Sequence, residues 1–201
     1  MNIGVDIDDT IVITTECIIK YADIFNKEVL GKEKNINEMG KIKDRFYLNN
    51  LYGWSDELKK QFFQKYYKNI LLECKVMKDV SKVLNRLKEE GDKIIFITAR
   101  MTYIKNCETY EITKNMLNEN NIPYDLIVMD AREKLNYAKE NNIDIFIEDS
   151  FETCKTLEET GIKSLLMTSV MNENIDTYEI ERVHSWEEVY NKICKLKKGE
   201  K

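Results

Sequence analysis

The chain has 201 residues and a formal net charge of −5; 43% of its residues are hydrophobic and 33% are charged. This length and composition suit one unit with a sizeable core, and they lie outside the ranges of disordered, collagen-like and disulfide-scaffold sequences. The net negative charge offers no attraction to nucleic-acid polymers or anionic membranes, so we expect neither as a partner.

The N-terminal residues MNIGVDIDDT contain three aspartates and no basic residue, which is unlike a secretory signal peptide. No apolar run approaches the roughly 18 residues of a membrane span. The five cysteines are scattered and form no Cys-x-x-Cys pair, which is typical of reduced thiols. We therefore expect a cytoplasmic protein without disulfides. The sequence leaves its oligomeric state open between a monomer and a homodimer.

The predicted elements alternate between buried strands and helices. The apolar residues Ile3 to Val5 form a first strand that runs into the polar residues Asp6 to Thr10. Further strands are expected at 93–98, 126–129, 143–147 and 163–167, with helices at 80–90, before 120, at 131–141 and at 151–161, and with a last helix after Ser185. This alternation predicts an α/β fold, a Rossmann-like parallel sheet with helices on both faces.

Residues 14–76 interrupt the alternation, because they carry helical stripes but no convincing buried strand. Ile18, Tyr21 and Phe25 share one helix face, and Ser55 is placed to cap a second helix. We therefore expect a small helical cap at 14–76, inserted after the first strand into a core made of residues 1–13 and 77–201.

Several enzyme classes are excluded by missing residues. The single histidine, His184, cannot supply a His-x-x-x-His metal site, and there is no Gly-x-Ser-x-Gly elbow. No cysteine is followed six residues later by arginine, as cysteine phosphatases require. The glycine spacing matches neither the dinucleotide fingerprint nor the nucleoside-triphosphate loop.

Two acidic groups follow predicted strands: Asp6-Ile7-Asp8-Asp9 and Glu148-Asp149. The carboxyl ends of parallel strands meet at one edge of a sheet, so these groups should converge. Clustered carboxylates repel one another unless a cation lies among them, which favours a hard divalent ion such as Mg²⁺. The alternative, solvated turns and helix caps, weakens because Thr98 and Lys134 follow two further strands.

In this order and strand context, the sequence resembles the haloacid dehalogenase superfamily of aspartate-nucleophile phosphatases. The four motifs that carry the resemblance are Asp6-x-Asp8-Asp9-Thr10, Ile97-Thr98-Ala99-Arg100, Lys134, and Ile147-Glu148-Asp149-Ser150. The helical insertion directly after the first motif resembles the 5′(3′)-deoxyribonucleotidase group. Two departures stand out: Asp9 replaces a common glycine, and Glu148-Asp149 replaces a common pair of aspartates.

The resemblance implies that Asp6 is the nucleophile and that Asp8 is the general acid and base. It also implies a Mg²⁺ ion bound by Asp6, by the backbone carbonyl of Asp8 and by Asp149. Such an enzyme hydrolyses phosphomonoesters of small substrates through an aspartyl-phosphate intermediate.

The same resemblance assigns Thr98, Ala99 and Lys134 to phosphate binding. Asp9 and Glu148 are expected to orient loops and ligands rather than to react. A solvated lysine is the alternative for Lys134, and a plain strand end is the alternative for Thr98.

Candidate substrate contacts are Arg100 and the aromatic residues of the cap, which are dense between positions 46 and 67. Phe46, Tyr47, Tyr52 and Trp54 are the candidates for stacking on a nucleobase. The alternative is packing within the cap, which we expect for Phe62, Tyr66 and Ile70 because they follow a helical stripe. For Arg100 the alternative is a surface ion pair.

The function that fits best is a 5′-nucleotidase of nucleoside or deoxynucleoside monophosphates. A phosphatase of sugar phosphates or other small phosphomonoesters is the alternative within enzymes. Outside enzymes, the alternative is a phosphate-binding or scaffold protein on the same fold. A phosphorylated receiver domain is disfavoured because Lys134 precedes the last acidic motif here, whereas receivers carry lysine on the last strand.

Overall fold

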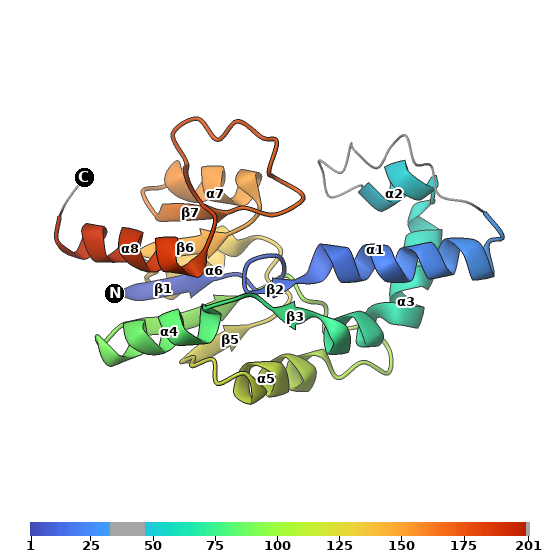
Figure 1. Ribbon diagram of the computed structural model, residues 1–201, viewed down its shortest axis with the longest axis horizontal. Helices are drawn as coiled ribbons and strands as arrows, with labels where there is room; N and C mark the ends of the chain where they lie inside the picture. The colour runs from blue at the N-terminus through green and yellow to red at the C-terminus, as the bar shows by residue number, and fades with distance from the viewer. Residues whose placement is uncertain (33–46, 200–201) are drawn as a thin grey trace.

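The computed structural model describes residues 1–32 and 47–199, which form a six-stranded sheet with helices on both faces and further helices beyond one end (Figure 1). The strand order is β5-β4-β1-β6-β7-β8, and all neighbouring strands are parallel. Its strands are β1 (Asn2–Val5), β4 (Lys93–Ile97), β5 (Leu126–Val128), β6 (Ile145–Glu148), β7 (Lys163–Met167) and β8 (Glu181–Val183). The expected parallel α/β fold is confirmed.

The first strand, β1, lies at the centre of the sheet between β4 and β6, which explains its apolar sequence. Gly4 pairs with Ile95 on one side and with Phe146 on the other. A Cβ atom at Gly4 would lie 2.6 Å from Cδ2 of Phe146, closer than packed carbons approach. Glycine at this position therefore permits the Phe146 ring to pack over the strand.

Helices cover both faces of the sheet, as the alternating sequence predicts. They are α4 (Val80–Glu89), α5 (Thr109–Glu119), α6 (Lys134–Glu140), α7 (Phe151–Glu158) and α8 (Trp186–Lys197). Side chains of α4, α5 and α8 form one apolar cluster with the sheet, whereas α6 and α7 pack in a second cluster against Ile95, Ile97 and Phe146. Strand β8 is short and polar at its start, and the sequence analysis did not predict it.

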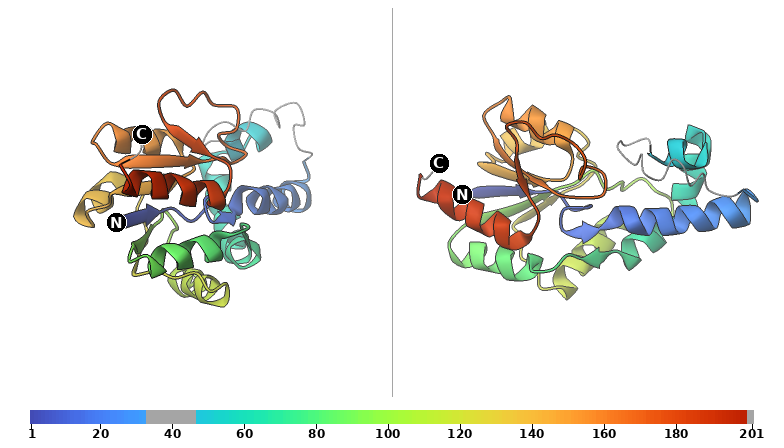
Figure 2. Two further views of the ribbon diagram at one scale, coloured as in Figure 1. Left: turned by 60° about the vertical axis from the view of Figure 1, so that its left-hand side comes forward. Right: turned by 45° about the horizontal axis from the view of Figure 1, so that its top comes forward.

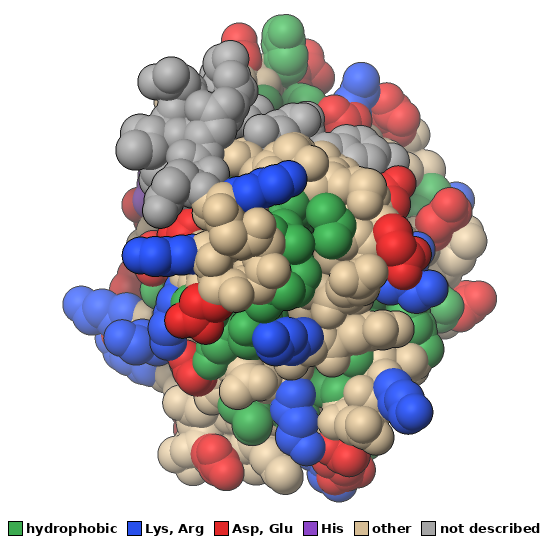
Figure 3. All heavy atoms as spheres, turned by 90° about the vertical axis from the view of Figure 1, so that its right-hand side faces the viewer, with side chains coloured by type: hydrophobic (Ala, Val, Ile, Leu, Met, Phe, Trp, Pro, Cys, Tyr) green, Lys and Arg blue, Asp and Glu red, His purple; other side chains and the backbone are tan. Residues whose placement is uncertain are grey.

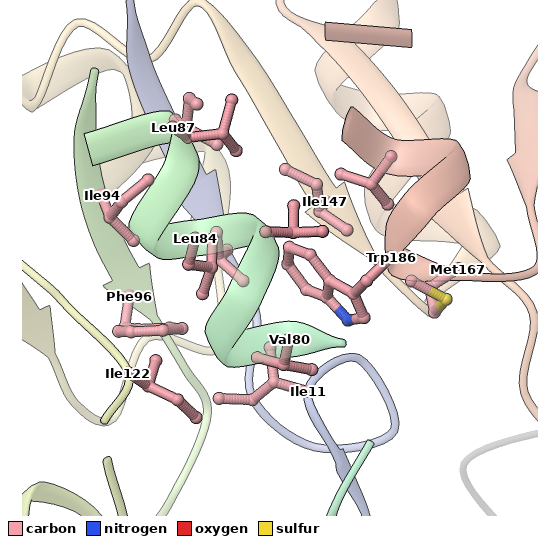
Figure 4. Packing of buried hydrophobic residues seen from close by; sticks show 14 of the residues in the cluster. Ile11, Val80, Leu84, Leu87, Ile94, Phe96, Ile122, Ile147, Met167 and Trp186 are labelled. Carbon is pink, nitrogen blue, oxygen red and sulfur yellow. The ribbon is translucent and has the colours of Figure 1, made fainter. Parts of the chain in front are cut away.

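The larger cluster supports the loop that follows β1. Leu84 and Leu87 of α4 pack with Trp186 of α8 and with the strands below them (Figure 4). The buried indole of Trp186 donates a hydrogen bond from Nε1 to the carbonyl of Thr10, at 3.0 Å. This bond anchors the end of the Asp6-x-Asp8-Asp9-Thr10 motif to the core.

We call residues 14–76 the cap segment. Its helices are α1 (Thr14–Ile24), α2 (Tyr47–Tyr52) and α3 (Asp56–Glu73), and a π-helical turn, η1 (Phe25–Val29), continues α1. As the sequence predicts, Ser55 caps α3 by accepting a hydrogen bond from the Leu58 N–H. The segment extends outward from one end of the sheet (Figures 1 and 2). On its outer end, hydrophobic, basic and acidic side chains are interspersed (Figure 3).

A short antiparallel ladder closes the base of the cap segment. In it, β2 (Val12–Ile13) pairs with β3 (Lys75–Val76). The sequence analysis expects no buried strand within 14–76, and β3 does not contradict this, because Lys75 is exposed and Val76 is only half-buried. A pair of two-residue strands leaves no periodic signal in the sequence. Among the described residues, no helix is long and apolar enough to cross a membrane.

Candidate active site

A cleft of about 680 Å³ lies between the carboxyl edge of the sheet and the cap segment. Its floor comes from the loops after β1, β4 and β6 and from the start of α6, and its walls come from α1 and α3. The sequence-predicted residues that line it are Asp6, Asp8, Asp9, Ala99, Arg100, Lys134, Glu148 and Asp149. The structure thus brings the four motifs together, as parallel strand ends should.

Asp9 adopts a left-handed backbone conformation with a φ of 55°. Aspartate tolerates this region better than most residues, although glycine adopts it more readily. The Asp9 carboxylate accepts hydrogen bonds from the backbone N–H groups of Thr14 and Thr15, at 2.9 and 3.0 Å, and from the Thr15 hydroxyl. Asp9 therefore turns the loop and fixes the start of α1, which accounts for aspartate where the superfamily commonly has glycine.

Lys134 is buried at the start of α6, and its ammonium lies between two carboxylates. Its Nζ is 2.5 Å from Oδ1 of Asp6 and 2.5 Å from Oε2 of Glu148. The other oxygen of Glu148 accepts hydrogen bonds from the backbone N–H groups of Asp149 and Ser150. Glu148 therefore holds Lys134 against Asp6 and shapes the loop that carries Asp149.

Ligand oxygens of Asp6, Glu148 and Asp149 lie within 4.8 Å of one another. Burial, together with the carboxylates of Glu148 and Asp8, raises the pKa of Asp6 to about 7 despite the Lys134 ammonium. Burial and the neighbouring Glu148 and Asp6 also raise the pKa of Asp149 well above its ordinary value. Lys134 compensates one of three acidic charges, so the site favours a cation, and its all-oxygen donor set fits a hard divalent ion.

Asp8 is held from two sides. The buried Arg100 guanidinium donates to its carboxylate, with Nη2 at 2.9 Å and Nε at 3.1 Å, and the Thr14 hydroxyl donates at 2.6 Å. Burial alone would raise the pKa of Asp8, but Arg100 and Thr14 lower it below the ordinary value. Arg100 is therefore a buried partner of Asp8 rather than a surface residue, and its Nη1 also donates to Thr113.

Asp149 is oriented by residues that the sequence analysis missed. The Ser169 hydroxyl donates to Oδ2 of Asp149 at 3.2 Å, and the buried Asn172 side chain donates to the Asp149 carbonyl at 2.7 Å. Arg182 in turn donates to Oδ1 of Asn172 at 2.6 Å. These residues lie in the loop after β7 and in β8, where no motif or periodicity points to them.

The two residues proposed for phosphate binding after β4 differ in position. Thr98 is fully buried, and its hydroxyl oxygen accepts a hydrogen bond from the Arg100 N–H at 3.2 Å. Ala99, the next residue, lines the cleft, whereas Thr98 is not among the lining residues.

The aromatic residues expected to face a substrate are placed differently by the structure. Tyr52 and Trp54 are buried in the cap segment, stacked with ring centroids 4.8 Å apart. The Trp54 indole donates to Oδ1 of Asn26 at 3.1 Å. Because both rings fill the interior of the cap segment, we correct their assignment from substrate contacts to packing residues. Phe46 and the side chain of Tyr47 lie outside the part of the chain that the structure describes.

The cap segment lines the cleft with other side chains, which the sequence analysis did not single out as substrate contacts. They are Thr14, Thr15, Ile18, Lys59, Tyr67, Ile70 and Leu71. Together with Met171 from the loop after β7, several of them give the cleft an apolar wall opposite the carboxylates. Tyr67 and Ile70 lie in α3, a helix with many apolar and aromatic residues. The sequence of such a helix does not show which of these residues pack inside the cap segment and which line the cleft.

Comparison with known proteins gives one family and one fold. Residues 1–198 match the family model described as 5′ nucleotidase, deoxy (pyrimidine), cytosolic type C protein. A nucleotidase of Clostridium acetobutylicum is 28% identical over 197 residues, which cover 98% of this chain and 95% of the relative.

Solved structures of similar fold share little sequence with the chain. A haloacid dehalogenase-like hydrolase of Streptococcus pneumoniae superposes with a TM-score of 0.68 at 19% identity, covering 96% of this chain and 97% of the other. A CbbY protein of Rhodobacter sphaeroides gives a TM-score of 0.67 at 11% identity, covering 94% and 95%. These likenesses establish the fold.

Proposed function

The chain belongs to the family of 5′ nucleotidases, deoxy (pyrimidine), cytosolic type C, and is a phosphoric monoester hydrolase; from that premise we propose that it is a Mg²⁺-dependent 5′-nucleotidase of nucleoside or deoxynucleoside monophosphates. The observation that carries the proposal is the position of the Asp6 carboxylate, which lies at the floor of the cleft against the Lys134 ammonium. A small phosphorylated substrate is the partner that this cleft suits.

The proposed metal ligands are the carboxylates of Asp6 and Asp149 and the backbone carbonyl of Asp8. The crowding of Asp6, Glu148 and Asp149 around a single ammonium supports a divalent cation at this place. When bound, Mg²⁺ would neutralise charge on the phosphate dianion and so favour its approach to a carboxylate.

In the proposed reaction, one oxygen of Asp6 attacks phosphorus and the ester oxygen of the nucleoside leaves. Lys134 contributes in two ways: its hydrogen bond fixes the rotation of the Asp6 carboxylate, and its positive charge faces the incoming phosphate. Water then attacks the phosphorus of the aspartyl phosphate, which releases inorganic phosphate and restores Asp6.

Asp8 is proposed to protonate the leaving oxygen and then to take a proton from the attacking water. Its ionised form is stabilised by Arg100 and Thr14, which suits the second role directly. For the first role it must carry a proton, which requires that substrate weaken the Arg100 contact. Arg100 is thus proposed to control Asp8 rather than to contact the substrate directly.

The phosphate oxygens are proposed to contact Lys134 and the backbone at Ala99, with Thr98 supporting that turn from beneath. The apolar wall of Ile18, Ile70 and Met171 would face the leaving group. The cleft volume of about 680 Å³ falls within the range of roughly 300 to 1,000 Å³ typical of small-molecule sites. The cleft is therefore large enough for a nucleoside monophosphate. Sugar phosphates are the second candidate class because they carry the same phosphomonoester group.

The test is a phosphate-release screen with Mg²⁺ over deoxynucleoside monophosphates, nucleoside monophosphates and sugar phosphates. We expect the highest kcat/KM for a nucleoside monophosphate and complete loss of activity in a folded Asp6→Asn variant. A preference for sugar phosphates would move the assignment to the second class. Phosphate binding without turnover would favour the phosphate-binding or scaffold alternative.

A further inference from the structure

Tyr67 reaches from the cap segment to the core. It lies in α3 with its ring buried, and it packs in a cluster with Leu71 of the same helix and with Ile104 and Cys107 of the loop after β4. The Phe63 ring meets it edge-on, with centroids 6.0 Å apart. The ring position of Tyr67 is therefore fixed by packing from both the cap segment and the core.

The hydroxyl of Tyr67 is engaged on one side only. Its oxygen accepts a hydrogen bond from the backbone N–H of Met101 at 2.9 Å. Among the side chains that the structure describes, the Tyr67 hydroxyl donates no hydrogen bond. Burial and the nearby Asp8 carboxylate raise the pKa of Tyr67 above its ordinary value, so the phenol keeps this proton.

Tyr67 lies at the cleft, where a bound substrate could accept this hydrogen bond. Tyr67 lines the cleft beside Asp8, Ala99 and Leu71. In the reaction proposed above, Asp8 protonates the ester oxygen, and the phosphate lies at Asp6 and its partner Lys134. A donor on the cap side of Asp8 therefore meets the leaving group just beyond the ester oxygen, where a pentose carries its ring oxygen and its hydroxyl groups.

We propose that Tyr67 donates a hydrogen bond to a sugar oxygen of the leaving group and thereby selects phosphate esters of pentoses and nucleosides over esters of simple alcohols. The inference rests on the proposed phosphatase activity and adds a specificity residue to it. A site built to pair with a sugar oxygen disfavours a leaving group that lacks one, because the buried hydroxyl then stays unpaired.

The test compares Tyr67→Phe with Tyr66→Phe. The first variant removes the proposed donor together with the oxygen that accepts the Met101 N–H, a loss that should affect all substrates alike. The second removes the hydroxyl of a neighbour in the same helix whose ring packs against Tyr21 and Phe25 inside the cap segment. The substrates are a deoxynucleoside 5′-monophosphate, deoxyribose 5-phosphate and phenyl phosphate, which has no sugar oxygen. Thermal melting of both variants is recorded in parallel.

We expect Tyr67→Phe to lower the ratio of kcat/KM for deoxyribose 5-phosphate to that for phenyl phosphate by about three- to tenfold, chiefly through KM, as suits one neutral hydrogen bond. The nucleotide ratio should fall equally, and Tyr66→Phe should leave both ratios unchanged. An equal loss for all three substrates, or a wild-type enzyme that ignores the sugar, would overturn the inference. If the wild type favours deoxyribose 5-phosphate over the nucleotide, the nucleotidase proposal fails, while the effect of Tyr67→Phe on the sugar ratio still decides the inference.

Discussion

The ammonium of Lys134 lies 2.5 Å from Oδ1 of Asp6, at the floor of a cleft in which Asp6, Glu148 and Asp149 also crowd together. The pair joins the end of β1 to the start of α6, residues 128 positions apart in the sequence. Removing the cation would leave the buried carboxylates of Asp6 and Glu148 and the half-buried carboxylate of Asp149 without their compensating charge, which is costly.

Lys134→Met is therefore expected to lower kcat/KM by about 100- to 1,000-fold, the usual effect of losing a charged group aimed at the reacting oxygens. It should also lower the melting temperature of the metal-free protein. Lys139→Met, at an exposed position of the same helix, is the matched control and should behave like the wild type. Retention of activity within threefold in Lys134→Met would argue against its proposed role.

The metal-free protein should lose stability as pH rises. Burial raises the folded-state pKa of Asp6 from 3.8 to about 7 and that of Asp149 in the same direction. Between the unfolded-state pKa of 3.8 and the folded-state pKa of about 7, the native protein binds more protons than the unfolded chain. The stability that these groups contribute is therefore greatest at low pH and is lost as pH rises through about 7.

Melting curves of protein treated with a chelator, taken from about pH 5 to 8, check this sign. Because a bound cation replaces the protons, added Mg²⁺ should raise the melting temperature more at pH 8 than at pH 5. Asp149→Asn should reduce the Mg²⁺-dependent increment. A metal-free protein that grows more stable between pH 5 and 7 would contradict this electrostatic picture of the site.

Asp9 combines a strained backbone with a capping carboxylate, and substitutions separate the two. Asp9→Ala should destabilise the protein by about 2 to 3 kcal/mol, since it loses the bonds to Thr14 and Thr15 and places alanine at a φ of 55°. Asp9→Gly should cost only about 1 kcal/mol, because glycine relieves the backbone. Equilibrium denaturation in urea measures both, and a less stable glycine variant would refute the argument.

The sequence predicted the site where its residues end parallel strands. Asp6, Ala99, Lys134 and Asp149 follow four different strands, and the sheet necessarily brings such ends to one edge. The residues that orient them could not be predicted in the same way. Asn172 reaches Asp149 from a loop without periodicity, and its role depends on hydrogen bonds that form only in the folded chain.

The cap segment shows a second kind of limit. An aromatic-rich stretch has the same composition whether its rings face inward or outward, so the sequence alone does not distinguish the buried Trp54 from a substrate contact. Tyr66 and Tyr67 are adjacent on one helix, yet one packs inside the cap segment and the other lines the cleft. Neighbouring positions on a helix point about 100° apart, so two adjacent residues face different surroundings. Which residue packs inside the cap segment and which lines the cleft is decided by the elements that lie against each face.

Trp54→Ala is accordingly expected to act through stability. Removing a buried indole that packs against Tyr52, Phe25 and Phe62 should cost about 3 to 5 kcal/mol and lower the melting temperature. Any residual activity should fall alike for nucleotides and for nitrophenyl phosphate. Trp54→Phe should keep most of the stability. A selective rise in KM for nucleotides in a stable Trp54→Ala variant would restore its role as a substrate contact.

The most direct test of the central claim is to trap the covalent intermediate. Enzyme mixed with a nucleoside 5′-monophosphate and Mg²⁺ is quenched with acid within one turnover, reduced with borohydride, and digested for tandem mass spectrometry. Because borohydride converts an aspartyl phosphate to homoserine, we predict homoserine at position 6 and its absence in Asp6→Asn. Homoserine at Asp8, or full turnover with no modified residue, would contradict Asp6 as the nucleophile.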